Sequence, residues 1–481
     1  MPQHSEHHQH STDDHSQGHA AHAAHAHVAH DHGSHGAMIH APSGDTPAAY
    51  QRAYREAQPE PGGMVVRVNL EARESDWEFT SRRPTRAWTF NGQVPGPCIE
   101  ARVGDVLEVR LTNHLPEPTT LHWHGLRLPA AMDGTDMVQH PIAPGDTFTY
   151  RFTLLDAGTF WYHTHSNEPV QLERGLYGAI IVRAADEPLL DRERVFVLSD
   201  VMLDADGQVA PHDGSERRGG REGNVRLLNG TSEPELMIWG GQVERWRIIN
   251  AAGARYVRLA IGRRPFRILG TGGGLLEAPV VARDVLLAPG ERVDLAVGPF
   301  EPGELLSVVA EPYDRGAGQG RAETFATLRV GPAAPSVASV RDVLRAITPL
   351  VDGPTTASRE VSFTEEVTVE GEVEFLVNGE RHHRADPVTV GELQIWDIVN
   401  ASAVDHPFHL HGFFFQVIER NGVPTALRSW EDTVNVPAGG RVRIAWVPDD
   451  RPGEWMYHCH ILEHHAAGMM AHFEVVRPSA A

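Results

Sequence analysis

The chain has 481 residues, a formal net charge of −22 and 41% hydrophobic residues. At about 100–200 residues per domain this length predicts roughly two to four domains, and the hydrophobic content is sufficient for several globular cores. The acidic charge argues against a nucleic-acid partner, which would require a basic surface, and no run of about 18 consecutive apolar residues indicates a membrane-spanning helix.

The first segment, residues 1–57, is rich in histidine and poor in core-forming residues. Its first 40 residues hold 13 of the 30 histidines of the chain. Such a low-complexity composition predicts a disordered tail rather than a packed domain. The segment lacks the charged start, apolar middle and small-residue cleavage site of a secretory signal. Metal capture by these histidines and a merely solvated tail are both compatible with their irregular spacing.

The rest of the chain repeats one pattern three times. In each copy an Asn-Gly pair is followed by a glycine and then, nine residues later, by an asparagine, with polar and apolar residues alternating between them. Such alternation, bounded by Gly, Pro and Asn, is typical of half-buried strands joined by turns. The copies contain Asn91-Gly92 with Asn113, Asn229-Gly230 with Asn250, and Asn378-Gly379 with Asn400. A repeat of about 140 residues is too long for a solenoid unit and predicts three consecutive β-sandwich domains, at 58–185, 186–332 and 356–481.

Residues 333–355 connect the second and third of these domains. They are rich in Pro, Ala, Ser and Thr. This composition predicts a surface linker rather than a core, and the sequence allows a short helix at 340–346.

The chain has only two cysteines, and they do not form a disulfide scaffold. Cys459 lies between two histidines and is assigned to metal. Cys98 is left without a partner, and we predict that it behaves as a small buried hydrophobic residue.

Two His-X-His pairs occur in the first predicted domain, at His122 and His124 and at His163 and His165. Alternate residues of a strand point to the same face, so each pair would present two imidazoles together. Imidazole is a ligand that suits copper. One pair alone is a weak signal, because surface strands contain such pairs by chance.

The third predicted domain adds a different cluster around Cys459. If 455–460 is a strand, His458 and His460 project to one face and Cys459 to the other, so that one strand serves two sites. Downstream, His464 and Met469 add an imidazole and a thioether. A thiolate with imidazoles and a distant thioether is the ligand set of a blue-copper electron-transfer centre.

A further cluster, at 406–411, supplies the remaining histidines. His406 is the obvious candidate for the second imidazole of the blue-copper centre. His409 and His411 form a fourth pair, which brings the paired imidazoles to eight. Eight nitrogens divide as three, three and two among three coppers and leave room for oxygen. A zinc site would need only four ligands, often with more than one thiolate, so copper is favoured.

With these four motifs the chain resembles the multicopper oxidase family, and in particular its three-domain bacterial laccases, over about residues 60–477. The resemblance implies an all-β fold of three consecutive cupredoxin-like Greek-key β-sandwich domains. It also implies a trinuclear copper cluster between the first and third domains and no copper ligand in the second. Of the four coppers implied, the type 1 copper would be held by His406, Cys459, His464 and Met469, the type 2 copper by His122 and His409, one type 3 copper by His124, His163 and His460, and the other by His165, His411 and His458.

By the same resemblance the activity is that of a laccase-like oxidase, which couples one-electron oxidation of phenols or aromatic amines to the four-electron reduction of O2 to water. His464 matches the exposed type 1 ligand of the family. It is expected to receive the substrate electrons, which Cys459 then passes on. Asp133 matches the proton-relay aspartate of the family, although Asp-Gly is also a common turn.

Two further residues bear on this chemistry. Many bacterial relatives have a glutamate directly after the position of His464, where this chain has His465. An imidazole can also shuttle protons, so the second proton route stays open. Asp432 is a candidate acceptor that would orient a type 1 histidine, or else a solvated loop carboxylate.

Three alternatives stay open at this point. A cuprous-ion oxidase for copper tolerance typically carries methionine-rich insertions, whereas the 10 methionines here are scattered. A copper nitrite reductase usually has two cupredoxin domains and lacks the full set of histidine pairs. A copper store or a metal-free scaffold would have lost ligands, and none is missing. We expect O2 with small phenolic or aromatic reductants or Cu(I) as partners, a monomeric chain, and the periplasmic or secreted location that the family implies.

Overall fold

The computed structural model describes residues 63–478, apart from 215, 317, 319 and 370. The predicted histidine-rich tail lies outside the described residues. Within them the fold is nearly all β, as predicted, with two short α-helices, α2 (Glu168–Glu173) and α3 (Leu462–Ala466). None of the helices in this part of the chain is long and apolar enough to cross a membrane.

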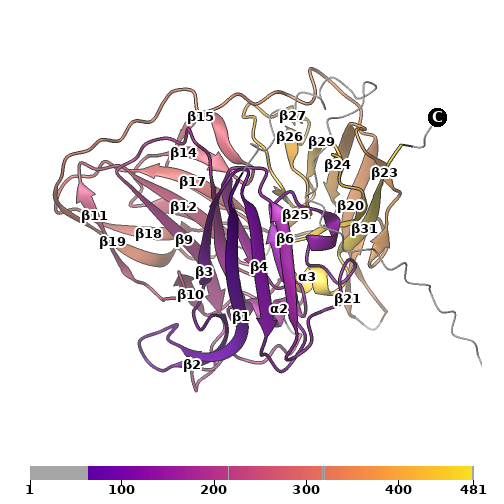
Figure 1. The fold of residues 1–481 in the computed structure, drawn as a ribbon, viewed down its shortest axis with the longest axis horizontal. Helices are drawn as coiled ribbons and strands as arrows, with labels where there is room; N and C mark the ends of the chain where they lie inside the picture. The colour runs from indigo at the N-terminus through magenta and orange to yellow at the C-terminus, as the bar shows by residue number, and fades with distance from the viewer. Residues whose placement is uncertain (1–62, 215, 317, 319, 370, 479–481) are drawn as a thin grey trace, which may run out of the picture. The chain divides into compact units, whose positions relative to one another are not determined.

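The strands of residues 65–183 form the first pair of sheets (Figure 1). They are β1 (Val65–Trp77), β2 (Thr85–Phe90), β3 (Gly96–Arg102), β4 (Val106–Asn113), β5 (His122–His124), β6 (Thr147–Thr153), β7 (Gly158–His163) and β8 (Tyr177–Arg183). One sheet has the order β2-β1-β4-β6 and the other β3-β8-β7-β5. A 3-10 turn, η1 (Ala130–Met132), follows β5.

The strands of residues 192–333 form the middle pair of sheets. They are β9 (Arg192–Val201), β10 (Val225–Leu228), β11 (Glu235–Gly240), β12 (Glu244–Asn250), β13 (Val257–Ile261), β14 (Phe266–Thr271), β15 (Gly274–Ala282), β16 (Asp284–Leu287), β17 (Arg292–Val297), β18 (Leu305–Glu311) and β19 (Glu323–Ala333). Their orders are β10-β9-β12-β17-β14-β15 and β11-β19-β18-β13-β16.

The strands of residues 359–476 form the third pair. They are β20 (Arg359–Val367), β21 (Val373–Val377), β22 (His383–Arg384), β23 (Val388–Thr389), β24 (Gln394–Asn400), β25 (His406–Leu410), β26 (Phe415–Arg420), β27 (Val423–Pro424), β28 (Thr433–Val436), β29 (Arg441–Trp446), β30 (Gly453–Cys459) and β31 (Met470–Val476). Their orders are β21-β20-β24-β29-β26-β27 and β22-β31-β30-β25-β28, and β23 also pairs with β31.

All three pairs of sheets share one arrangement. The strand that ends in the repeated asparagine pairs in parallel with an earlier strand: β4 with β1, β12 with β9 and β24 with β20. On its other side it pairs antiparallel with the strand after the second turn, which is β6, β17 or β29. The sequence repeat is therefore a structural repeat. The domain boundaries that we drew from it stay predictions.

The repeated asparagines have the same role in each copy. Asn113, Asn250 and Asn400 are buried at the ends of their strands. In each, Nδ2 donates to two backbone carbonyls, and Oδ1 accepts from the backbone N–H two residues later. One side chain thus satisfies three backbone groups where the chain leaves the strand. The three Asn-Gly pairs have φ of 50° to 56° at Asn and 74° to 79° at Gly, as a tight hairpin turn requires.

The largest buried hydrophobic cluster draws on both the first and the third pair of sheets. It includes Trp123, Tyr162, Phe408 and Trp455. The middle pair has a core of its own around Trp246. The strands β5, β7, β25 and β30, which carry most of the predicted metal-binding histidines, therefore border one continuous core.

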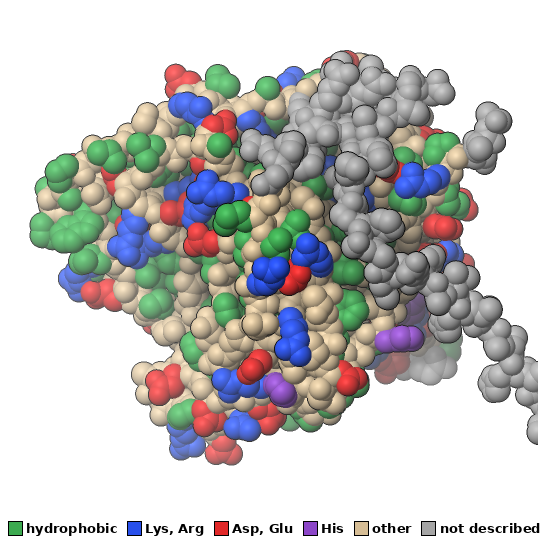
Figure 2. All heavy atoms as spheres, viewed as in Figure 1, with side chains coloured by type: hydrophobic (Ala, Val, Ile, Leu, Met, Phe, Trp, Pro, Cys, Tyr) green, Lys and Arg blue, Asp and Glu red, His purple; other side chains and the backbone are tan. Residues whose placement is uncertain are grey.

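The surface mixes charges of both signs. On the face drawn in Figure 2, the basic side chains, all of them Arg, are interspersed with Asp and Glu rather than gathered in one patch. The described residues also include many exposed ion pairs, such as Arg329 with Glu235 at 2.8 Å. Exposed pairs of this kind add little to stability, so the fold depends on its cores.

Two local expectations were wrong. Cys98 is exposed on β3 rather than buried, because the alternation of this strand turns it away from the core. Residues 340–346 form no helix. The linker also carries the buried side chains of Leu344, Ile347 and Leu350, so part of it belongs to a core.

Candidate metal centres

Three of the four side chains predicted for the type 1 copper meet in the third pair of sheets, and the fourth residue, Met469, adjoins them along the backbone. We call His406, Cys459, His464 and Met469 the sulfur site. Nδ1 of His406 lies 3.4 Å and Nδ1 of His464 3.7 Å from the sulfur of Cys459. Met469 adjoins both neighbours, because its N–H donates to the carbonyl of His464 (3.0 Å) and its carbonyl accepts from the N–H of Cys459 (3.1 Å). All four residues are buried, so the thiol sulfur and the two imidazole nitrogens converge where water is excluded.

The second nitrogens of both histidines of the sulfur site are occupied. Nε2 of His406 hydrogen-bonds the hydroxyl of Ser402 at 2.7 Å, and Nε2 of His464 donates to the carbonyl of Arg218 at 3.2 Å. Such partners determine which nitrogen faces a metal. Burial lowers the pKa of both imidazoles, to about 3 for His406, and raises the pKa of the Cys459 thiol. The imidazoles are therefore ready as neutral ligands, whereas the thiol loses its proton only when a metal binds.

The expectation that His464 is an exposed ligand was wrong. Its side chain is 0% exposed. The ring of Phe375 stacks on it with 4.1 Å between the ring centroids, and the backbone of Arg218 covers its Nε2. The residue that faces solvent here is Arg218. An electron from a substrate would therefore arrive through this cover rather than at a bare imidazole edge.

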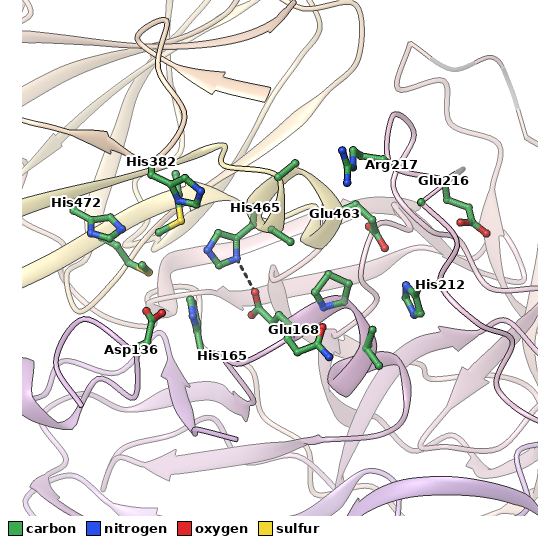
Figure 3. A pocket seen from close by; sticks show the side chains of 18 residues that line it. Asp136, His165, Glu168, His212, Glu216, Arg217, His382, Glu463, His465 and His472 are labelled. Atoms are coloured by element: carbon green, nitrogen blue, oxygen red, sulfur yellow. Dashed lines mark hydrogen bonds and ion pairs between the residues drawn. The ribbon is translucent and has the colours of Figure 1, made fainter. Parts of the chain in front are cut away.

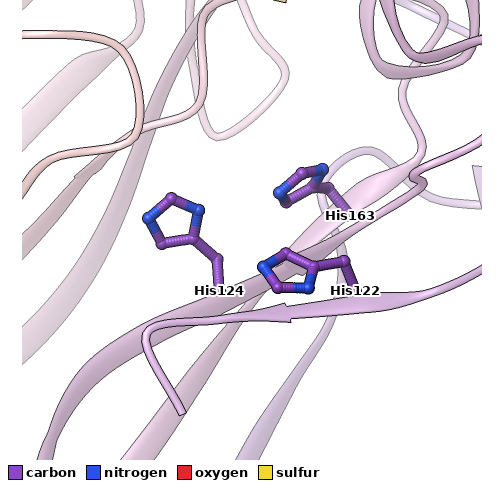
Figure 4. A group of neighbouring side chains, drawn as sticks. All are labelled: His122, His124 and His163. Atoms are coloured by element: carbon purple, nitrogen blue, oxygen red, sulfur yellow. The ribbon is translucent and has the colours of Figure 1, made fainter. Parts of the chain in front are cut away.

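The other eight predicted ligands form a second group, which we call the histidine cluster: His122, His124, His163, His165, His409, His411, His458 and His460. His122 lies opposite His163 on β5 and β7, and His409 lies opposite His458 on β25 and β30. In Figure 4 the rings of His122, His124 and His163 surround a common space. The ring of His124 stacks on that of His409 at 3.8 Å between centroids, so the first and third pairs of sheets build the cluster together.

The nitrogens of the histidine cluster are arranged for a metal. In five of the eight rings, Nδ1 hydrogen-bonds a backbone carbonyl or a carboxylate, which leaves Nε2 for the centre. Nitrogens of six rings are buried without a hydrogen-bond partner among the described residues: those of His122, His124, His163, His165, His409 and His460. Such an atom costs about 1–3 kcal/mol if nothing binds it. The donor set therefore fits copper, for which neutral imidazole is a preferred ligand.

Burial keeps these rings neutral. It is the largest cause that lowers the pKa of seven of them, among them His411 and His460. A protonated imidazole cannot bind a metal, so a lowered pKa extends the pH range in which the cluster can act as a ligand set.

Asp133 follows η1 and is buried beside the histidine cluster. Its Oδ2 accepts from Nδ1 of His411, and its backbone carbonyl accepts from Nδ1 of His122, both at 2.8 Å. Gly134 has a φ of 82°, and a Cβ there would lie 1.9 Å from the carbonyl oxygen of Leu121. The Asp-Gly pair thus forms a tight turn, and the same turn aims the carboxylate at the cluster.

Asp432 is buried at the histidine cluster, so both readings of the sequence were wrong: it orients no type 1 histidine and is not a solvated loop carboxylate. Its Oδ1 accepts from Nε2 of His124, and its backbone carbonyl accepts from Nδ1 of His409, both at 3.0 Å. Arg292 on β17 donates to both carboxylate oxygens, at 2.7 Å to Oδ1. Burial raises the pKa of Asp432, but Arg292 and the histidines outweigh this effect and hold it well below its usual range. The middle pair of sheets, which has no predicted ligand, thus positions the cluster through Arg292.

Glu168 is a buried carboxylate that the sequence motifs did not reveal. Its Oε2 accepts from Nδ1 of His465 at 2.7 Å, and its Oε1 lies 3.1 Å from Nδ1 of His163 (Figure 3). His465 in turn stacks on His458 with 4.2 Å between ring centroids. The resemblance implies a glutamate at position 465. This chain has an imidazole there, and it hydrogen-bonds a carboxylate of α2. No spacing could have signalled this, because 297 residues separate the two.

Comparison with known proteins agrees with this geometry. Two family models, both described as multicopper oxidase, match residues 71–187 and 356–479. The multicopper oxidase MmcO of Mycobacterium tuberculosis is 31% identical over 434 residues, which cover 81% of this chain and 83% of that protein. The laccase of Bacillus subtilis is 27% identical over 473 residues, which cover 82% and 91%. The solved structure of a multicopper oxidase from Campylobacter jejuni, described as a metallo-oxidase, matches with a TM-score of 0.77 at 30% identity, over 88% of this chain and 96% of that one. The chain therefore belongs to the multicopper oxidase family, and it is a copper-binding oxidoreductase of cupredoxin-like fold.

Proposed function

We propose that the chain is a laccase-like oxidase, which couples the one-electron oxidation of small phenols or aromatic amines to the reduction of O2 to water. One observation carries the proposal. Cys459 belongs to the sulfur site, while its neighbours His458 and His460 belong to the histidine cluster. An electron-accepting site and an oxygen-binding site are thus one residue apart along the chain. The same proposal includes a monomeric chain that works in the periplasm or outside the cell.

We assign four coppers to these residues. The type 1 copper takes His406, Cys459, His464 and Met469, the type 2 copper His122 and His409, one type 3 copper His124, His163 and His460, and the other His165, His411 and His458. Ring centroids within each type 3 set are 5.0 to 5.9 Å apart, and rings of different sets lie as close, so the division itself follows the family resemblance. The rings of His122 and His409 are 5.8 Å apart.

Copper at these residues would supply one-electron transfer at the sulfur site and the reduction of O2 at the histidine cluster. The backbone itself provides the route for electrons between the sulfur site and the histidine cluster. Cys459 is bonded on either side to His458 and His460, and these two covalent steps span on the order of ten ångström. It also provides protons, which the formation of water requires. The hydrogen bond between Nδ1 of His411 and Oδ2 of Asp133 can carry a proton to the edge of the cluster.

Cu(I) is the second candidate reductant, as the metallo-oxidase of Campylobacter jejuni suggests. We favour aromatic reductants at the sulfur site because of what covers it. Arg218, whose backbone covers His464, is exposed, and a guanidinium stacks readily on aromatic rings.

Oxygen uptake by the copper-loaded protein distinguishes the two reductants. We expect 2,6-dimethoxyphenol to support uptake with a higher kcat/KM than Cu(I), both with and without added Cu(II). The Cys459→Ser chain with the same additions corrects for oxidation of Cu(I) in solution. The opposite ranking would identify a metallo-oxidase, and no uptake with either reductant would refute the oxidase proposal.

The Asp133→Asn substitution is expected to lower kcat about 100-fold, because asparagine keeps the size of the side chain but cannot accept and release a proton. The copper content should be measured in the same samples, so that turnover is expressed per loaded chain. Asp146→Asn, on an exposed turn, is the matched control. Turnover of the Asp133→Asn chain close to wild type would remove Asp133 from the mechanism.

A further inference from the structure

A pocket of about 420 Å³ opens beside the histidine cluster and is lined by residues of α2, α3 and β31 (Figure 3). Its middle is bordered by His165, His465 and Glu168, which belong to the cluster or touch it. The end that Figure 3 shows with Asp136 also carries His382 and His472. Met456 and Met470 line the same pocket, which brings the further side chains with sulfur or imidazole groups to four. None of these four takes part in the sulfur site or the histidine cluster.

The strand register places three of these groups on one face. On β30 and β31, Met456 lies opposite His472, and His458 lies opposite Met470. Residues two apart in a strand share a face, and directly opposite residues have Cβ atoms about 4.5–5.5 Å apart. Ala471, between the two β31 residues, is fully buried in the core, so Met470 and His472 face the pocket. A thioether and an imidazole therefore meet across the strands, one step from the cluster residue His458.

His382 is the fourth side chain at this end of the pocket, and His472 offers a nitrogen without a hydrogen-bond partner among the described residues. His382 is held next to β31 because its N–H donates to the carbonyl of Gly468 at 2.9 Å. Nε2 of His472 is buried and has no hydrogen-bond partner among the described residues. Burial lowers the pKa of His472, and both His382 and Asp136 are close enough to influence it further, the first lowering and the second raising it. An imidazole in this position is neutral and has a nitrogen free for a ligand.

The two thioethers and two imidazoles favour Cu(I) over the other common metal ions. Thioethers are soft ligands that favour Cu(I), and imidazole also suits copper. Calcium and magnesium prefer several oxygen ligands, whereas this end of the pocket offers the single carboxylate of Asp136. Structural zinc is usually held by thiolates and imidazoles, and no thiol lines this pocket.

We propose that this end of the pocket binds one Cu(I) ion. The ligands are two thioethers and two imidazoles, those of Met456, Met470, His382 and His472, and Asp136 offsets the positive charge. The ion is additional to the four coppers assigned above, and the proposal does not depend on which reductant the sulfur site accepts. Because Met470 adjoins His458, the ion stands between solvent and the histidine cluster, where copper can be held before it enters.

Silver provides the test, because Ag(I) resembles Cu(I) and does not change its oxidation state under these conditions. The copper-loaded full chain is equilibrated with Ag(I) in chloride-free buffer, and the metal per chain is counted after dialysis. Relative to the wild type, the His382→Asn/His472→Gln chain is expected to lose about one Ag(I). Asparagine is chosen at 382 because this residue has a φ of 52°, which asparagine tolerates.

The matched control makes the same two changes at histidines outside the pocket, His114→Asn and His383→Gln. It should bind as much Ag(I) as the wild type, and the histidine-rich tail contributes equally to all three chains. Silver X-ray absorption should show sulfur neighbours in the wild type that the pocket variant lacks. Equal Ag(I) binding by the wild type and the pocket variant, or a lost ion without sulfur neighbours, would overturn the proposal. An unchanged melting temperature shows that the pocket variant is folded.

Discussion

The Cys459→Ser chain is expected to lose its blue-copper colour and to turn over organic reductants about 1000-fold more slowly or not at all. The sulfur of Cys459 lies 3.4 and 3.7 Å from the Nδ1 atoms of His406 and His464, so it is the centre of the donor set. A serine hydroxyl is a harder ligand, and it does not ionise readily in a buried site. The same change removes the residue that connects the sulfur site with the histidine cluster.

The visible spectrum, the copper content and the oxygen uptake of this variant check the expectation. Copper per chain should fall by one, because the histidine cluster keeps all its own ligands. Cys98→Ser is the matched control, since Cys98 is the other cysteine of the chain and lies exposed on β3. A Cys459→Ser chain that keeps the blue colour or half of its turnover would show that the sulfur site has been assigned wrongly.

The sequence was sufficient to predict the features that are encoded locally. His122 and His124 point to one face because they are two residues apart on a strand, and the same alternation separates Cys459 from its two neighbours. The repeated asparagines were visible because each copy needs the same side chain to satisfy backbone groups at the end of a strand. Periodicity and repetition thus yielded the all-β fold and the grouping of the candidate ligands into two neighbouring sets.

Contacts between distant segments could not be predicted in this way. Glu168 meets His465 across 297 residues, and Arg218 covers His464 across 246. Such contacts depend on how the pairs of sheets pack on one another. The spacing of residues along the sequence carries no information about that packing. The prediction for Cys98 was wrong for a different reason, because Pro95 and Pro97, just before it, obscure the strand alternation that turns it outward.

The Asp432→Asn substitution shows how strongly the histidine cluster depends on one of these distant contacts. Asp432 and Arg292 are 1% and 0% exposed, and 140 residues separate them. Asparagine would leave the guanidinium of Arg292 buried without a counter-charge, which costs about 3–5 kcal/mol. It would also place an amide N–H₂ where Nε2 of His124 or Arg292 now finds an acceptor.

We therefore expect the metal-free Asp432→Asn chain to melt roughly 5 °C lower than the wild type, because about 1 kcal/mol corresponds to 2–4 °C in domains of 150–250 residues and to less in a longer chain. Copper per chain should also fall, since His124 and His409 both lose their fixed orientation. The control is Asp284→Asn, which breaks a pair of the same kind with Arg258 at 2.8 Å, but with side chains 39% and 45% exposed. That pair should contribute less than about 1 kcal/mol, because solvent screens it. Equal melting temperatures of the two variants would mean that Arg292 and Asp432 do not hold the middle sheets to the cluster, and that another contact positions His124.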